Sequence, residues 1–100
     1  MPDVLNSFQE KFPDTWAAYE QLKNNCDRQG PLDAKTVELV KISISTAQEH
    51  LGGLIAHISQ ARKVGANEDE IYHAILLATS LAGFPAVLAA FGTAKEYLGD

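Results

Sequence analysis

Two histidines and a glycine occur with helical spacing in the middle of the sequence. His50, Gly53 and His57 are three and four residues apart, so on one helix they would share a face. The Cα atoms of the two histidines would be roughly 10.5 Å apart along a straight helix that rises ~1.5 Å per residue. Gly53 has no side chain to fill the space between them. The pattern predicts a small notch with a titratable imidazole at each edge.

Glu38 is the carboxylate expected to complete this site. It precedes His50 by twelve residues, and it would face the notch from the preceding helix if the chain bends near Gly52. A glutamate hydrogen-bonded to an imidazole fixes the tautomer of the ring and raises its basicity, which is the usual arrangement of a general base. With one imidazole taking up a proton and the other delivering one, the site would suit isomerisation or decarboxylation of a lactone through an enolate-like state.

The same residues also have structural interpretations. Glu38 could pair with Lys35 or Lys41 on a solvated helix face, and His57 could be a core histidine bonded to a backbone carbonyl. His73 is expected to be a packing residue at the edge of an apolar helix. No metal site is predicted, because histidines ~10 Å apart on one helix cannot share an ion through ligand bonds of ~2 Å. No cofactor site is predicted either, since no glycine loop of the phosphate-binding type occurs.

Length and composition narrow the possible classes of protein. One hundred residues allow a single domain over 1–100, and 46% apolar residues are typical of a globular chain. Eight basic and thirteen acidic residues give a net charge of −5, which argues against binding to nucleic acid or to anionic membranes. Cys26 is the only cysteine, so an intramolecular disulfide is excluded. No secretory or membrane-spanning segment is recognised, and we expect a soluble cytoplasmic protein.

The elements that position the candidate site are predicted to be helices. N-cap residues and helix breakers divide the chain, whereas no segment combines alternation, β-branched residues and turn dipeptides as strands do. The N-caps are expected at Asp14, Asp33 and Asn67, and the breaks at Gly30-Pro31, Gly65 and Gly83-Phe84-Pro85. Gly52-Gly53 marks either a bend in one helix or the meeting of two. The sequence therefore predicts an all-α bundle of five to six helices.

Apolar residues at helical spacing predict the faces of these helices. The expected faces are Thr15, Tyr19, Leu22 and Cys26; Val37, Val40, Ile44, Ala47 and Leu51; Leu54, Ile58 and Ala61; Ile71, Ile75, Ala78 and Leu81; and Leu88, Phe91, Ala94 and Leu98. The face from Ile71 to Leu81 is expected to be buried. The stretch from Ile71 to Phe91 carries very few charges, and a helix that is apolar around most of its circumference must be covered on several sides. We expect this helical pair to lie in a subunit interface of a homo-oligomer.

Three blocks of the sequence also resemble a known family. They are Leu32–Val40 (LDAKTVELV); His57 with Ala61–Ala66 (ARKVGA) and Glu68–Ile71 (EDEI); and Leu81–Ala86 (LAGFPA). In order and spacing, the stretch from Leu32 to Phe91 resembles the carboxymuconolactone decarboxylase family, which includes the alkylhydroperoxidase D-like proteins. The resemblance implies an alkylhydroperoxidase D-like helical bundle that assembles as a homo-oligomer, commonly a trimer or a hexamer.

The peroxidase branch of this family is similar in carrying a Cys-x-x-Cys pair with a histidine four residues after it and a glutamate twelve residues before it. Placed on this chain, the pattern matches the proton-relaying glutamate to Glu38 and the histidine to His57. The two cysteines fall on His50 and Gly53, so both sulfurs are missing. Disulfide exchange requires a thiolate, and the dithiol mechanism is therefore not expected here.

The decarboxylase branch also lacks the cysteine pair, and its members act without a cofactor. The resemblance thus implies a small cofactor-free lyase or isomerase for a small carboxylated or lactone-type molecule, with Glu38 and His57 as catalytic residues and His50 as a second titrating group. Two alternatives remain open. One is a peroxidase-related protein that has lost its dithiol, and the other is a non-catalytic oligomeric module that binds a small ligand.

Overall fold

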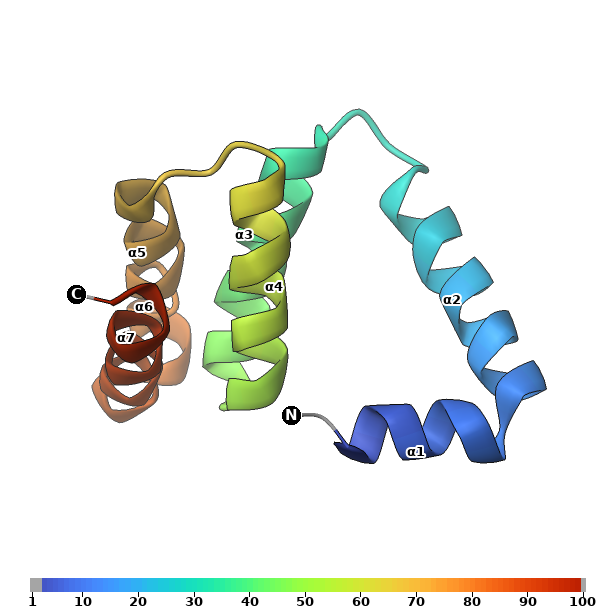
Figure 1. The fold of residues 1–100 in the computed structure, drawn as a ribbon. Helices are drawn as coiled ribbons and strands as arrows, with labels where there is room; N and C mark the ends of the chain where they lie inside the picture. The colour runs from blue at the N-terminus through green and yellow to red at the C-terminus, as the bar shows by residue number, and fades with distance from the viewer. Residues whose placement is uncertain (1–2, 100) are drawn as a thin grey trace. The chain divides into compact units, whose positions relative to one another are not determined.

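The computed structural model describes residues 3–99, and the side chains of residues 4–99. These residues form helices and no strand, which confirms the all-α prediction. Six helices have nine residues or more, and α6 is a single turn. Their bounds are α1 (Asp3–Lys11), α2 (Pro13–Asp27), α3 (Ala34–Ala47), α4 (Leu51–Lys63), α5 (Glu68–Leu76), α6 (Thr79–Ala82) and α7 (Phe84–Leu98) (Figure 1). None of them is long and apolar enough to cross a membrane.

Between Pro31 and Leu32 the described chain divides into two compact units. The first unit contains α1 and α2, and α2 begins with Pro13 in its first turn and Phe12 as N-cap residue. A proline is tolerated there because the first N–H groups of a helix have no partner within the helix. The prediction that Asp14 is the N-cap is therefore wrong, and Asp14 lies in the first turn of α2 instead.

The first unit carries a series of aromatic contacts but little buried surface. Ring centroids are 5.2 Å apart for Phe8 and Phe12, 6.5 Å for Phe8 and Trp16, and 5.5 Å for Trp16 and Tyr19. No residue of α2 is buried, and the predicted face that holds Tyr19 and Leu22 is exposed. The first unit itself therefore does not bury the predicted face.

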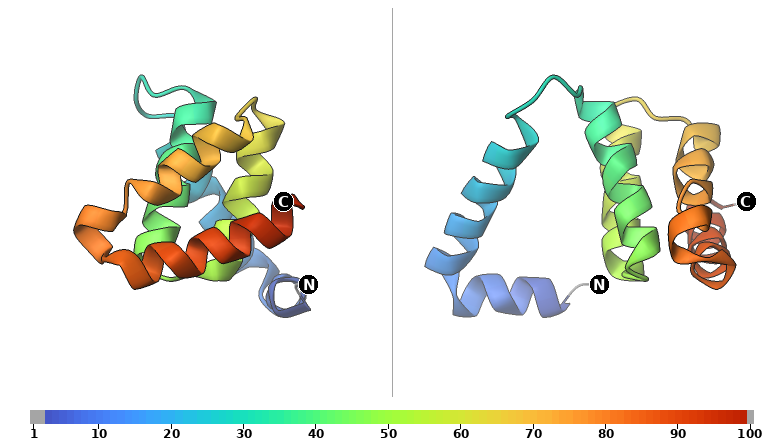
Figure 2. Two further views of the ribbon diagram at one scale, coloured as in Figure 1. Left: turned by 90° about the vertical axis from the view of Figure 1, so that its left-hand side faces the viewer. Right: turned by 180° about the vertical axis from the view of Figure 1, so that it is seen from behind.

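The second unit, α3 to α7, contains the hydrophobic core. Helix α3 packs chiefly on α4 and α5, and α7 packs on α4 and α5. Figures 1 and 2 show α5, α6 and α7 together on one side of the α3–α4 pair. The buried core residues are Ile42, Leu54, Ile58, Ala61, Ala66, Ile71, Ala74, Ile75, Ala78, Val87, Ala90 and Ala94. Alanine supplies six of these twelve positions, so the helices of this unit can approach closely.

Two capping interactions fix the starts of α3 and α5. The Asp33 carboxylate accepts a hydrogen bond from the Thr36 backbone N–H at 2.8 Å. Hydrogen bonding to the Thr36 side chain and to this backbone N–H lowers the pKa of Asp33. Asn67 and Glu70 form a reciprocal capping box at the start of α5, with bonds of 2.8 and 2.9 Å. Of the three N-caps predicted from the sequence, those at Asp33 and Asn67 are therefore present.

An ion pair joins the two capped helix starts. Lys35 Nζ lies 2.9 Å from Glu70 Oε2, although the residues are 35 positions apart. The hydrogen bond between them lowers the pKa of the Glu70 carboxyl and raises the pKa of the Lys35 ammonium. The first turns of α3 and α5 are therefore held at a fixed distance, which helps to define the packing of α3 on its neighbours.

The chain changes direction sharply between α3 and α4. Helix α3 ends at Ala47, Glu49 adopts a left-handed conformation with φ of 56°, and His50 is the N-cap residue of α4. Of the two arrangements that the Gly52-Gly53 pair left open, the structure has two helices. The turn lets α4 run back along α3, so that residues of the two helices meet.

Several large apolar side chains face outward. Leu81, predicted to be buried, is 91% exposed on α6, so that prediction is wrong for the single chain. Val40 and Ile44 on α3 and Leu88 on α7 are also exposed. In α7 it is Ala86, Val87, Ala90 and Ala94 that are buried. Small residues thus form the inner face of α7, and large apolar residues lie on its outer face.

Candidate functional site

The structure brings Glu38 and His57 together across the α3–α4 contact. Nδ1 of His57 lies 2.9 Å from Oε1 of Glu38. Glu38 projects from the second turn of α3 and His57 from the middle of α4. The pair therefore joins a carboxylate from one helix to an imidazole from the next, within the second unit.

This pair is sheltered but reachable. The Glu38 side chain is 14% exposed and that of His57 is 27% exposed. An ionised carboxylate can only accept a hydrogen bond, so the ring donates its Nδ1–H to Glu38, and in the neutral ring this leaves the lone pair on Nε2. A fixed tautomer with a basic Nε2 is the form that abstracts a proton from a ligand. The arrangement can therefore act as a general base, whichever ligand reaches it.

His50 is placed differently from the sequence interpretation, although it remains next to α4. It is not part of the helix but its N-cap residue, and it is exposed. Its imidazole folds back over Gly53, close to the position that a Cβ would occupy there. Among residues 3–99, no hydrogen-bond partner is present for either ring nitrogen. His50 thus offers an imidazole without a hydrogen-bond partner among these residues, and this ring lies over Gly53, which precedes His57 by one helical turn.

No metal centre accompanies these residues. In the part of the chain that the structure describes, no group of three histidine, cysteine, aspartate or glutamate side chains is arranged to hold an ion.

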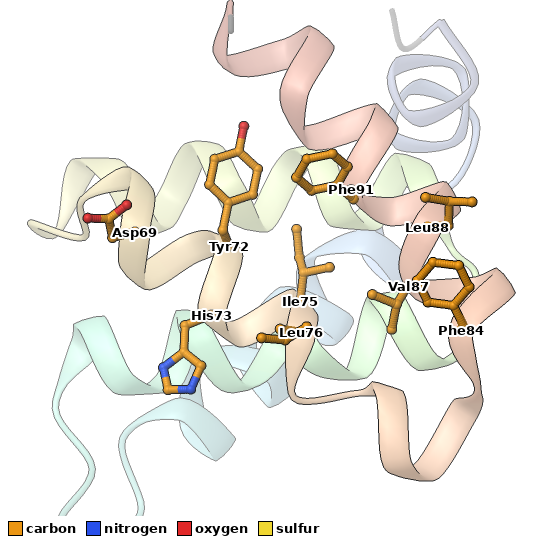
Figure 3. Close-up of a pocket in the computed structure, with 9 residues that line it drawn as sticks. All are labelled: Asp69, Tyr72, His73, Ile75, Leu76, Phe84, Val87, Leu88 and Phe91. Carbon is orange, nitrogen blue, oxygen red and sulfur yellow. The ribbon is translucent and has the colours of Figure 1, made fainter.

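A groove lies on another face of the same unit, between α5 and α7. Figure 3 shows its aromatic and aliphatic walls, with Asp69 and His73 toward one end and Phe84 and Leu88 toward the other. It encloses about 550 Å³, and its lining residues are Asp69, Tyr72, His73, Ile75, Leu76, Phe84, Val87, Leu88 and Phe91. The Tyr72 and Phe91 rings are 5.4 Å apart. None of the three predicted site residues lines this groove.

Comparisons with known proteins place the chain in a family. The sequence model of the carboxymuconolactone decarboxylase family matches residues 13–96. The chain belongs to the carboxymuconolactone decarboxylase family. The predicted family is thereby confirmed, and the match extends beyond the stretch from Leu32 to Phe91 on which the prediction depended.

A solved structure supports the fold of this carboxymuconolactone decarboxylase family member. The crystal structure of an apo carboxymuconolactone decarboxylase family protein from Legionella pneumophila matches with a TM-score of 0.84 and 22% identity, over 96% of this chain and 86% of that chain. At that identity the likeness shows a shared fold. None of the curated proteins matches the chain.

Two features of this family member were missed by the sequence interpretation. The Lys35–Glu70 ion pair was not foreseen, although the two residues lie in the first turns of helices whose N-caps were recognised. The groove between α5 and α7 was not predicted; the sequence interpretation recognised only that this apolar segment must be buried against other helices. Its signal was the low charge between Ile71 and Phe91, but a helical pattern does not show where two helices leave a gap.

Proposed function

We propose that this protein is a small cofactor-free acid–base enzyme, a lyase or isomerase that acts on a small carboxylated or lactone-type molecule. The single observation that supports it most is the 2.9 Å contact between Nδ1 of His57 and Oε1 of Glu38 in a partly sheltered place. Carboxylate-oriented imidazoles are the commonest general bases in enzymes. Family membership supports the substrate class, since the family takes its name from a lactone decarboxylase.

In this proposal Nε2 of His57 exchanges a proton with the substrate. For isomerisation, Nε2 removes a proton from a carbon next to the lactone carbonyl, and the electron pair moves into the enolate. A protonated imidazole, His50 or His57, then returns a proton at a second carbon. For decarboxylation, the bond between the ring carbon and the carboxylate carbon breaks and carbon dioxide leaves. The electron pair that remains on the ring carbon takes a proton from the protonated imidazole, again His50 or His57. Solvent restores that proton, so no oxidant or metal is consumed.

The test is carbon dioxide release from a panel of γ-lactones that carry a carboxylate on the ring, followed together with lactone isomerisation by NMR. We expect turnover with at least one of them and its loss in the His57→Ala variant. Absence of both reactions across the panel, with folded protein, would refute the proposed chemistry.

The peroxidase-related alternative depends on a different residue, Cys26. Peroxide reduction by sulfur would need Cys26, the only cysteine, which is exposed on α2. Peroxide turnover that disappears in Cys26→Ser would favour this alternative, whereas an acid–base enzyme keeps its lactone activity in that variant.

The non-catalytic alternative is favoured by a specific observation, the groove between α5 and α7. Its volume of about 550 Å³ falls in the range of ~300–1,000 Å³ that is typical of small-molecule sites. Saturable binding of an apolar molecule there, unaffected by His57→Ala and without any turnover, would support a ligand-binding module.

We also propose that the protein assembles as a homo-oligomer, a trimer or a hexamer. The support is a set of large apolar side chains between α5 and α7 that the second unit does not bury. Six of them are each at least 43% exposed: Leu76, Leu77, Leu81, Phe84, Leu88 and Phe91. Burial of such side chains between subunits is what stabilises a homo-oligomer. A monomer by light scattering at micromolar concentration would contradict this assembly.

A further inference from the structure

Gly53 is a glycine for reasons of space. It lies in the first turn of α4, where the helix places no special demand on its backbone. A Cβ built on it would overlap Nδ1 of His50 and lie 2.9 Å from Cε1 of the same ring, closer than the about 3.5–4.0 Å of an ordinary carbon contact. Gly52 differs, because a Cβ there would meet nothing within 4 Å. The His50 ring therefore occupies the side-chain space of residue 53.

This placement brings the two imidazoles to one face of α4. Gly53 precedes His57 by four residues, and Cβ positions at that spacing are about 5–6 Å apart on a helix. Helical side chains lean toward the N-terminus, so the His57 side chain lies over the turn that contains Gly53. The His50 ring, which fills the Cβ position of Gly53, is therefore the neighbour of His57, although its own Cα lies outside the helix.

We propose that Gly53 is a positioning residue that holds the His50 imidazole beside His57, so that both rings contact one small carboxylate or lactone ligand. The inference depends on the proposed function for the ligand's chemical class. Glu38 engages Nδ1 of His57, and no described side chain engages either nitrogen of His50. One ring is thus held as a base, and the other is left free to donate a proton or a hydrogen bond to the ligand.

Glycine-to-alanine variants at two adjacent positions test this arrangement. Gly53→Ala inserts a methyl group where the ring lies, and Gly52→Ala adds the same group on the same turn into open space. Because His50 is an exposed side chain, its ring can swing away from Gly53→Ala without unfolding α4. His50→Ala removes the ring directly and serves as a second variant should Gly53→Ala fail to fold.

The readout is NMR of the imidazole rings, with a saturated γ-butyrolactone carboxylate as an unreactive probe. In the wild type and in Gly52→Ala, we expect a nuclear Overhauser effect between the His50 ring and the Gly53 α-protons. In both proteins the probe should shift the resonances of both imidazole rings with one dissociation constant. In Gly53→Ala, only His57 should shift, with affinity about three- to tenfold weaker, the loss of roughly one hydrogen bond. His50→Ala should weaken the probe equally, and the double variant no further.

Each other outcome decides against the inference. It is overturned if the probe shifts only one ring or neither ring in the wild type. It is also overturned if both rings still shift in Gly53→Ala, or if the double variant is weaker than His50→Ala alone. If the probe shifts both rings as expected but no lactone is turned over, the proposed reaction fails and the shared site of the two imidazoles stands.

Discussion

Replacing His57 with alanine should cost stability and activity by separate, measurable amounts. The variant loses the 2.9 Å bond to Glu38 and leaves that side chain, only 14% exposed, without its partner. Removing one partner of a partly buried hydrogen bond costs ~1–3 kcal/mol, and each kcal/mol lowers the melting temperature of a domain this size by about 4–8 °C. Loss of a general base lowers turnover by about 10²–10⁴-fold.

Thermal unfolding by circular dichroism and carbon dioxide release from lactone acids measure the two effects on the same samples. Gln60→Ala is the matched control, because Gln60 is exposed on the same helix and should change neither quantity by much. Glu38→Gln separates the roles further. Its amide oxygen can still accept the Nδ1–H of His57, so stability should change less than in His57→Ala, but the neutral amide no longer supports the imidazolium, and turnover should fall.

The reasoning would be refuted by a His57→Ala protein that is as active as the Gln60→Ala control. Full activity in Glu38→Gln would be informative in another way. It would show that the carboxylate serves the helix contact alone, and that His57 acts without the orienting charge that the 2.9 Å contact supplies.

Three further outcomes follow from other parts of the structure. The hydrogen bond from Lys35 lowers the pKa of Glu70 from 4.5, so the stabilisation from this carboxylate is complete above pH 4.5 and is lost as the pH falls through the lowered pKa. In the Glu70→Gln variant, the melting temperature should therefore fall less steeply below about pH 4 than in the wild type. Leu81→Glu places a charge on the most exposed apolar position and should shift the oligomer toward monomer in light scattering, with helical content by circular dichroism unchanged. Gly52→Ala, which meets nothing within 4 Å, should raise the free energy of unfolding in urea by about 0.5–1 kcal/mol, because alanine is the better helix former.

Local rules explain why much of the second unit could be predicted. Asp33 and Asn67 cap helices through contacts within four residues, and Gly65, with φ of 101°, follows α4 where a left-handed residue is needed. Such features depend only on neighbouring residues, so the sequence contains them directly. The meeting of Glu38 and His57 was foreseen because a turn near Gly52 folds the two helices back on each other.

The side chains that were misjudged share one cause. Helical periodicity shows that a face is apolar, but it does not show whether this chain or another molecule covers that face. Leu81 was expected on the buried stripe of its helix and is 91% exposed, whereas Ala90 and Ala94 are fully buried. On α7 the residues that pack inward are small, namely Ala86, Val87, Ala90 and Ala94, whereas Leu88 and Phe91 of the same helix are exposed.

The residues at positions 50 and 53 give the strongest reason to prefer proton transfer to redox chemistry. A Cys-x-x-Cys pair would place two thiols at these positions, whereas this chain has an imidazole that lies over a glycine. The neighbouring Glu38–His57 pair is assembled and partly exposed. A carboxylate and two imidazoles can move protons but cannot store a pair of electrons. The proposed reactions, loss of carbon dioxide from a lactone acid and shift of its double bond, need only proton transfer from these groups.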